Sequence, residues 1–294
     1  MKIGMNATCL RCHFGKNMDT AMALGDEATA LAFGKDLMRL YLDAPEGVAS
    51  PWFGPGVTAL FQKHYGLPED RYVEEKRLSN AYVLQRMDVI RNMVESQPDP
   101  VYAGLQFAIL GNYLDFSALQ GKVSFEELDR MLEQGFSIEV DRQCYEKLSR
   151  DLENGKRLLF LTDNAGEIGF DSIFAQQIAA RYPQLQITFC VRGGPVLNDA
   201  TREDATAVGV PFPVIDSGNC IGGTDLRLLG AEARQAMEEA DVIISKGMGN
   251  VETAYGCGYN IYYAFLVKCK MFADRFQKPL MTPMLVREWD NKTE

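Results

Sequence analysis

Residues 157–167 read RLLFLTDNAGE, an apolar run that ends abruptly in polar residues and a glycine. The run at 158–162 has the length and composition of a buried β-strand. Similar runs alternate with amphipathic stretches further along the chain, at residues 187–191, 212–215, 242–245 and 280–285. This alternation predicts an α/β fold with a doubly wound, mostly parallel sheet between two helical layers, a three-layer αβα arrangement.

The helices of this half are expected at 171–181, 200–208, 225–239 and 262–276. Upstream, apolar residues recur every three or four positions, which is typical of amphipathic helices. This spacing predicts helices at 17–40, 57–65, 77–96, 101–113, 124–134 and 140–154. We therefore expect a helical N-terminal domain at residues 1–150 and an α/β domain at residues 151–294.

Composition narrows the class of protein. Of the 294 residues, 47% are hydrophobic, which is typical of a soluble globular chain. A net charge of −10 argues against a nucleic-acid partner, which requires cations to neutralise phosphates. No segment reaches the roughly 18 uncharged apolar residues of a membrane span, so no membrane association is expected. Seven cysteines, an odd number, and no signal-like N-terminus predict a cytoplasmic protein with reduced thiols.

Polar or glycine-rich segments follow four of the five expected strands, at 163–167, 192–199, 216–219 and 246–252. Ligands of parallel α/β sheets bind beyond the carboxyl ends of the strands, so these segments are expected on one rim. Asp163, Asn164 and, in the next connection, Asp199 offer oxygen ligands that suit Mg²⁺ or Mn²⁺. Gly166 would allow a sharp turn there. Helix capping is the alternative role of the two aspartates.

Lys246 opens a second polar segment, KGMGN at 246–250. A glycine-rich loop after a strand exposes N–H groups that can cradle a phosphate, with Lys246 as the counter-charge. Neither the Walker A pattern nor GxGxxG is present. Glu167 and Asp171 are one helical turn apart and could face the same site, or form a solvated helix face.

Five motifs, taken in order, resemble the damage-control phosphatase family, first catalogued as domain of unknown function 89. They are Cys9-x-x-Cys12, GNYLDF at 111–116, DNAGE at 163–167, KGMGNVE at 246–252 and Lys268-Cys269. The first two resemble the stand-alone prokaryotic branch of that family. The motifs span nearly the whole chain.

The resemblance implies a metal-dependent phosphatase that acts on small phosphorylated metabolites, such as sugar phosphates or damaged cofactor phosphates. It implies that Asp163, Asn164 and Asp199 hold a divalent metal (Mn²⁺, Mg²⁺, Co²⁺ or Ni²⁺) and that Lys246 contacts the phosphate. The residues expected to line the substrate cleft with Lys246 are Asn112, Asp115, Gly166, Glu167, Gly247 and Asn250.

Two other functions fit parts of the sequence. A parallel sheet also serves nucleotide- or S-adenosylmethionine-binding transferases, although their glycine-rich first loop is absent. The close pair Cys9 and Cys12 fits a non-catalytic metal or redox protein. That pair lacks the second CxxC or HxxxH that a closed zinc site would need.

Overall fold

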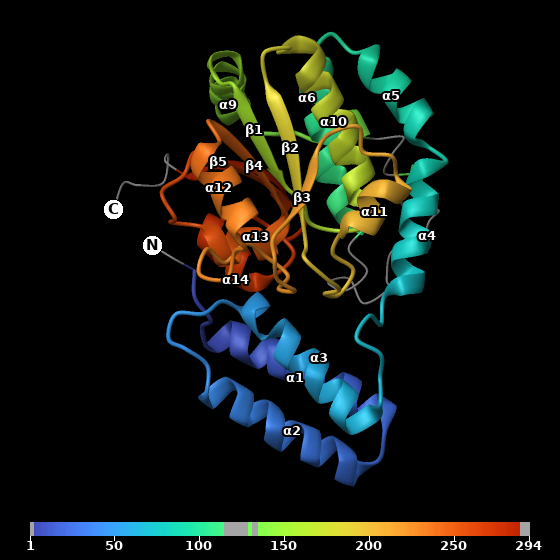
Figure 1. Cartoon of the computed structure of the whole chain (residues 1–294), viewed down its shortest axis with the longest axis vertical. Coiled ribbons are helices and arrows are strands. Elements are labelled where there is room, and N and C mark those ends of the chain that lie inside the picture. Colours follow the sequence, from blue (N-terminus) through green and yellow to red (C-terminus); the bar gives the residue numbers. More distant parts are fainter. Residues whose placement is uncertain (1–2, 115–128, 131–134, 289–294) are drawn as a thin grey trace.

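The computed structural model describes residues 3–114, 129–130 and 135–288 (Figure 1). The helix expected at 124–134, apart from residues 129–130, and the candidate Asp115 lie outside the described residues. In the described part of the chain, no helix is both long enough and apolar enough to cross a membrane.

A six-stranded sheet forms the centre of the fold, with the strand order β3-β2-β1-β4-β5-β6. Its strands are β1 (Arg157–Leu161), β2 (Gln186–Val191), β3 (Val214–Asp216), β4 (Val242–Lys246), β5 (Ile261–Leu266) and β6 (Pro283–Arg287). The first five run parallel and β6 pairs antiparallel with β5. The α/β class and the mostly parallel sheet are thereby confirmed.

Helices cover both faces of this sheet, because strand side chains alternate between them. Leu158 and Phe160 face one apolar core, and Leu159 and Leu161 face the other. The first core contains α4 (Val73–Leu84), α5 (Met87–Glu95), α6 (Pro100–Gly111), α9 (Arg142–Asn154), α10 (Glu167–Arg181) and α11 (Arg202–Ala207). The second contains α12 (Ala231–Glu239), α13 (Gly247–Ala254) and α14 (Lys270–Phe276).

The first three helices form a separate packed unit. α1 (Ala7–Leu24), α2 (Glu27–Leu42) and α3 (Gly54–Tyr65) enclose their own core around Phe33, Leu37 and Phe61. Figure 1 shows this unit set apart from the layered sheet, below it in this view. The helices of residues 1–150 therefore pack in two groups, because α4 to α6 belong to the core against the sheet and α1 to α3 do not. A domain boundary at residue 150 stays a prediction.

The helix expected at 262–276 is wrong. Residues 261–266 form β5, buried on both faces, and a helix begins only at Lys270. The helix expected at 17–40 is interrupted after Leu24, where Gly25 ends α1 and the Asp26 carboxylate caps α2 by accepting from Thr29 N at 2.7 Å. The helix expected at 77–96 also divides, into α4 and α5.

Candidate functional site

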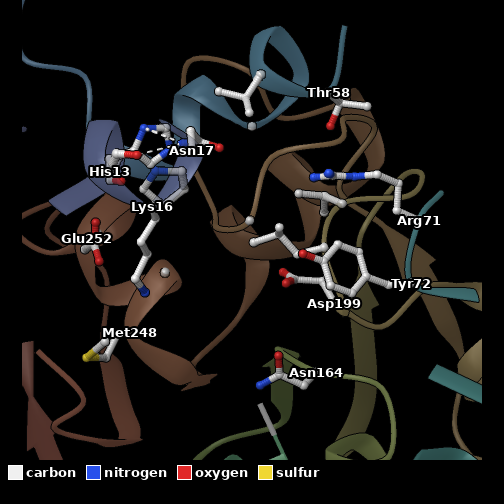
Figure 2. Close-up of a pocket in the computed structure, with 18 of the residues that line it drawn as sticks. His13, Lys16, Asn17, Thr58, Arg71, Tyr72, Asn164, Asp199, Met248 and Glu252 are labelled. Carbon is white, nitrogen blue, oxygen red and sulfur yellow. Dashed lines mark hydrogen bonds between the residues drawn. The ribbon is translucent and has the colours of Figure 1, made fainter. Parts of the chain in front are cut away.

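A pocket of about 460 Å³ lies between the helical unit α1–α3 and the carboxyl edge of the sheet (Figure 2). This volume is within the range of small-molecule sites. The sheet side of the pocket includes Asp163, Asn164, Asp199, Met248 and Glu252. The connections after β1 and β4 meet here, which is where the strand order reverses and where doubly wound sheets bind ligands.

The three expected metal ligands are brought together by backbone pairing after β1 and β2. Asn164 and Asp199 form an isolated antiparallel bridge, and Ala200 N donates to Asp163 O at 2.7 Å. Asp163, Asn164 and Asp199 are each less than 10% exposed and all line the pocket. The structure therefore places two carboxylates and one amide side by side at the pocket wall.

The chain makes the expected sharp turn at Gly166. Its φ is +75°, a conformation that side-chain-bearing residues rarely adopt, and α10 begins at the next residue. Its N–H donates to Asn80 Oδ1 of α4 at 2.7 Å. The turn is thus fastened to α4, and its N–H group is already paired within the protein.

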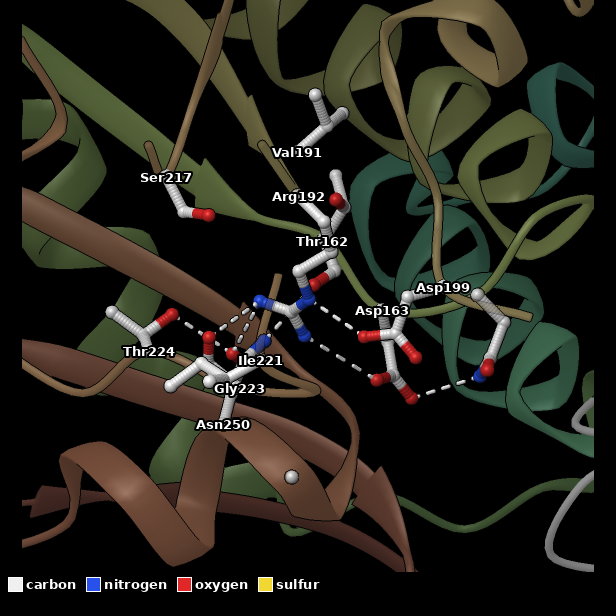
Figure 3. A network of polar contacts seen from close by, with 12 residues as sticks. Thr162, Asp163, Val191, Arg192, Asp199, Ser217, Ile221, Gly223, Thr224 and Asn250 are labelled. Carbon is white, nitrogen blue, oxygen red and sulfur yellow. Dashed lines mark hydrogen bonds and ion pairs between the residues drawn. The ribbon is translucent and has the colours of Figure 1, made fainter. Parts of the chain in front are cut away.

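Arg192 lies behind the two carboxylates and was not identified as a site residue from the sequence. Its Nε donates to Asp199 Oδ2 at 2.6 Å, and its Nη2 lies 3.8 Å from Asp163 Oδ1 (Figure 3). Its Nη1 donates to Gly223 O and to Asn250 Oδ1. The guanidinium is 2% exposed. The sequence did contain a signal for this role: an arginine directly follows the expected strand 187–191 and opens the connection that contains Asp199.

Asn112 and Glu167 form hydrogen bonds with Asp163 and Asn164 from inside the protein. The Asn112 amide, at the end of α6, donates to Asp163 Oδ2 at 2.9 Å and to Glu167 Oε2 at 3.0 Å. Asn164 Nδ2 donates to the same two oxygens, at 2.8 and 2.7 Å. Asn112 and Glu167 are fully buried, and neither lines the pocket. They hold Asp163 and Asn164 in place instead of lining the cleft.

Lys246 lies on the other side of Glu167 and differs most from expectation. Its ammonium donates to Ala108 O at 2.7 Å, to Glu167 Oε1 at 2.6 Å and to Asp171 Oδ1 at 2.7 Å. Although burial opposes it, the carboxylates of Asp171 and Glu167 raise the pKa of Lys246. The side chain is completely buried and absent from the pocket lining. All three of its protons are bonded inside the protein.

The rest of the KGMGN segment forms the first turn of α13. Gly247 has a φ of +74°, and a Cβ there would lie 1.9 Å from Asp163 Oδ2. Only glycine lets the helix start this close to the carboxylate. Asn250 is buried, and its amide donates to Thr162 O and Lys246 O. Met248 and Gly249 face the pocket, whereas Lys246 and Asn250 connect strands and helices beneath it.

The opposite wall comes from the N-terminal helices and is cationic. Lys16 of α1 and Arg71, which precedes α4, extend into the pocket (Figure 2). His13 also lines it, and burial, together with nearby Lys16, lowers the pKa of His13 to about 4. Its imidazole is therefore neutral at pH 7 and lies 2.5 Å from the Tyr41 hydroxyl. Positive charge on the helical side faces carboxylates on the sheet side.

Glu252 of α13, on the sheet side of the pocket, lies near Cys9 of the close cysteine pair. Burial raises the pKa of Glu252 to about 7. Cys9 and Cys12 are free thiols of α1 and lie outside the pocket lining. Within residues 3–114, 129–130 and 135–288, no three His, Cys, Asp or Glu side chains are arranged to hold a metal ion. Among the described residues, Cys9 and Cys12 are therefore not part of a cluster of three or more such ligands.

Comparison with known proteins agrees with the resemblance. A family model described as the damage-control phosphatase ARMT1-like domain matches residues 5–282. An uncharacterized protein of Methanocaldococcus jannaschii is 32% identical, over 90% of each chain. A damage-control phosphatase of Archaeoglobus fulgidus is 34% identical, over 70% of this chain and 71% of its own.

The fold agrees as well. The crystal structure of a DUF89 family protein from Pyrococcus horikoshii superposes with a TM-score of 0.82 at 26% identity. The match covers 97% of this chain and 99% of the other, so it includes both the helical unit and the sheet. The chain belongs to the damage-control phosphatase ARMT1-like family.

Proposed function

We propose that the protein is a metal-dependent phosphatase that hydrolyses phosphomonoesters of small metabolites, such as sugar phosphates or damaged cofactor phosphates. The observation that carries this proposal is the gathering of Asp163, Asn164 and Asp199 at a pocket whose opposite wall is cationic. Relatives that are named damage-control phosphatases support the same activity. All seven cysteines are free thiols, which fits the reducing cytoplasm.

The donor set fits a hard divalent cation. Two carboxylates and an amide oxygen are the ligand types that Mg²⁺ and Mn²⁺ prefer, and Co²⁺ or Ni²⁺ can use the same set. Three protein ligands leave coordination positions for water and a phosphate oxygen. Such an ion supplies Lewis acidity at the phosphoryl group and neutralises negative charge there. We propose Asp163, Asn164 and Asp199 as its ligands.

The chain's own residues keep this set in position. Arg192 pairs with Asp199 and lies near Asp163, and so limits the repulsion between two closely spaced carboxylates before any ion is bound. Asn112 donates to Asp163 from the opposite side. We assign Lys246 a positioning role, because its contacts hold Glu167 and Asp171 on α10 and not a ligand in the pocket.

The test is a screen of the purified full-length chain against phosphomonoesters with Mn²⁺, Mg²⁺, Co²⁺ and Ni²⁺ in turn. Asp163→Asn and Asp199→Asn are expected to abolish turnover and to weaken metal binding measured by calorimetry, with little change in the melting temperature of the metal-free protein. Asp216→Asn is the matched control, since Asp216 also ends a strand at this edge but lies outside the pocket lining. Hydrolysis that persists in a chelator, or in Asp163→Asn, would contradict the proposal.

A further inference from the structure

Arg71 is a half-buried residue on the wall of the pocket. It makes no hydrogen bond or ion pair with any residue that the structure describes. The neighbouring carboxylate of Asp70 is directed elsewhere, toward Tyr72 N at 2.9 Å and Lys76 at 3.9 Å. Figure 2 shows the Arg71 side chain extending into the pocket. Its donors are therefore available to a ligand.

Aromatic rings hold this guanidinium in place. Its Cζ lies 4.3 Å from the centre of the Phe61 ring and 5.9 Å from that of Tyr72. Phe61 belongs to the apolar core of the helical unit and is 1% exposed, so the surface beneath Arg71 is fixed. A guanidinium stacked on a ring is restrained before it binds and loses less conformational freedom on pairing with an anion. The side chain is thus preorganised and not merely a solvated surface charge.

The cations of the site lie in three places, one of which is the sheet side of the pocket, where Lys268 follows β5 beside Met248. Arg192 and Lys246 are fully buried and already pair with carboxylates beneath the pocket. Arg71 and Lys16 instead line the pocket on its helical side, and no ion pair to a described residue is found for either. The proposed metal ligands lie on the sheet side of the same pocket. A ligand whose phosphate reaches the sheet side can therefore extend its other end to Arg71.

We propose that Arg71 binds a second anionic group of the substrate. The preferred substrates are then small phosphomonoesters with a carboxylate or a further phosphate at their far end. The planar fork of a guanidinium matches both groups with two parallel hydrogen bonds. The hydroxyl-bearing side chains Ser50 and Thr58 also line the pocket and suit a polyhydroxylated backbone between the two charges. This inference rests on the proposed phosphatase function.

The experiment compares a hexitol 6-phosphate with the aldonic acid 6-phosphate of the same carbon chain, using the full-length protein with Mn²⁺. Both are open chains, and they differ only at the end far from the phosphate, which is a hydroxymethyl group in one and a carboxylate in the other. The wild type is expected to favour the acid in kcat/KM. In Arg71→Met that preference should fall by about tenfold or more, the loss expected for a charged hydrogen-bonded contact. Arg71→Lys should retain part of it, because the charge remains.

Arg77→Met is the matched control, since Arg77 is an exposed arginine of α4 that pairs with Glu74 outside the pocket. It should leave the preference unchanged. An equal loss of kcat/KM for both substrates in Arg71→Met would mean that Arg71 contacts the reacting phosphate, and would overturn the proposal. An unchanged preference in a variant with the wild-type melting temperature would overturn it as well.

A failure of the proposed function itself gives a different result. In that case the wild type hydrolyses neither substrate, nor an aryl phosphate, with any of the four metals. Calorimetric titration of the aldonic acid 6-phosphate then tests the subsite without turnover. Binding that weakens at least about tenfold in Arg71→Met supports the subsite, whereas equal binding to both proteins, or no binding, overturns it.

Discussion

Replacing Lys246 by methionine distinguishes a positioning role from a phosphate contact. Methionine keeps most of the side-chain length but removes the ammonium that bonds to Glu167, Asp171 and Ala108 at 2.6–2.7 Å. Both carboxylates are completely buried and lose their cation. Breaking a buried ion pair on one side costs about 3–5 kcal/mol in unfolding free energy. At about 2 °C per kcal/mol for a chain of this size, the melting temperature should fall by roughly 6–10 °C.

The matched variant is Lys246→Met with Asp171→Asn. The amide needs no counter-charge, so the double variant should recover part of the lost stability, and the two substitutions should not be additive. Thermal and urea unfolding of the metal-free protein measure both effects. If Lys246→Met melted like the wild type and lost only phosphatase turnover, the lysine would be a phosphate contact and our assignment of a positioning role would be wrong.

Three further predictions concern residues at or behind the pocket wall. Arg192→Met should lower the unfolding free energy by about 3–5 kcal/mol, because Asp199 and Asp163 are left buried without their cation. Mn²⁺ should then raise the melting temperature of this variant more than that of the wild type. An equal rise in both proteins would contradict the prediction. Gly247→Ala should destabilise the fold and reduce turnover, since a Cβ would lie 1.9 Å from Asp163 Oδ2, and wild-type melting and activity would refute the contact. His13 has a pKa lowered to about 4 by burial, so the native state binds fewer protons than the unfolded state between pH 4 and 6.5. Stability should therefore fall by about 3 kcal/mol as pH drops through this window, and His13→Asn should lack that part of the fall in urea unfolding.

The gathering of Asp163, Asn164 and Asp199 could be predicted because it depends on topology alone. Parallel strands end at one edge, and the segments after β1 and β2 lie side by side once those strands pair. Arg192 and Asn112 are different, because their contacts with these carboxylates depend on side-chain direction and on α6 packing against the sheet. Asn112 is 51 residues from its partner in sequence, and nothing local in the sequence records that contact.

The missed strand β5 has a simple physical cause. Residues 261–266 read IYYAFL, and every one of them is buried. A strand covered by helices on both faces lacks the polar alternation that marks a half-exposed strand. A continuous apolar run of this kind cannot be told from a buried helix by periodicity. This ambiguity is the reason why a single helix was expected at 262–276, where the structure has β5 and then α14.

Lys246 shows how one residue at a strand boundary determines the interpretation of a motif. A strand that ends at Ser245 leaves Lys246 in a loop, free to reach a phosphate. In the structure β4 continues to Lys246, which pairs in register with Ala264. It then obeys strand alternation and takes the direction of Val242 and Ile244, whose side chains lie in the core on the α6 and α10 side. There the ammonium meets Glu167 and Asp171 of α10, so a lysine in a glycine-rich motif lies beneath the pocket. The cations that line the pocket are Lys16, Arg71 and Lys268 instead.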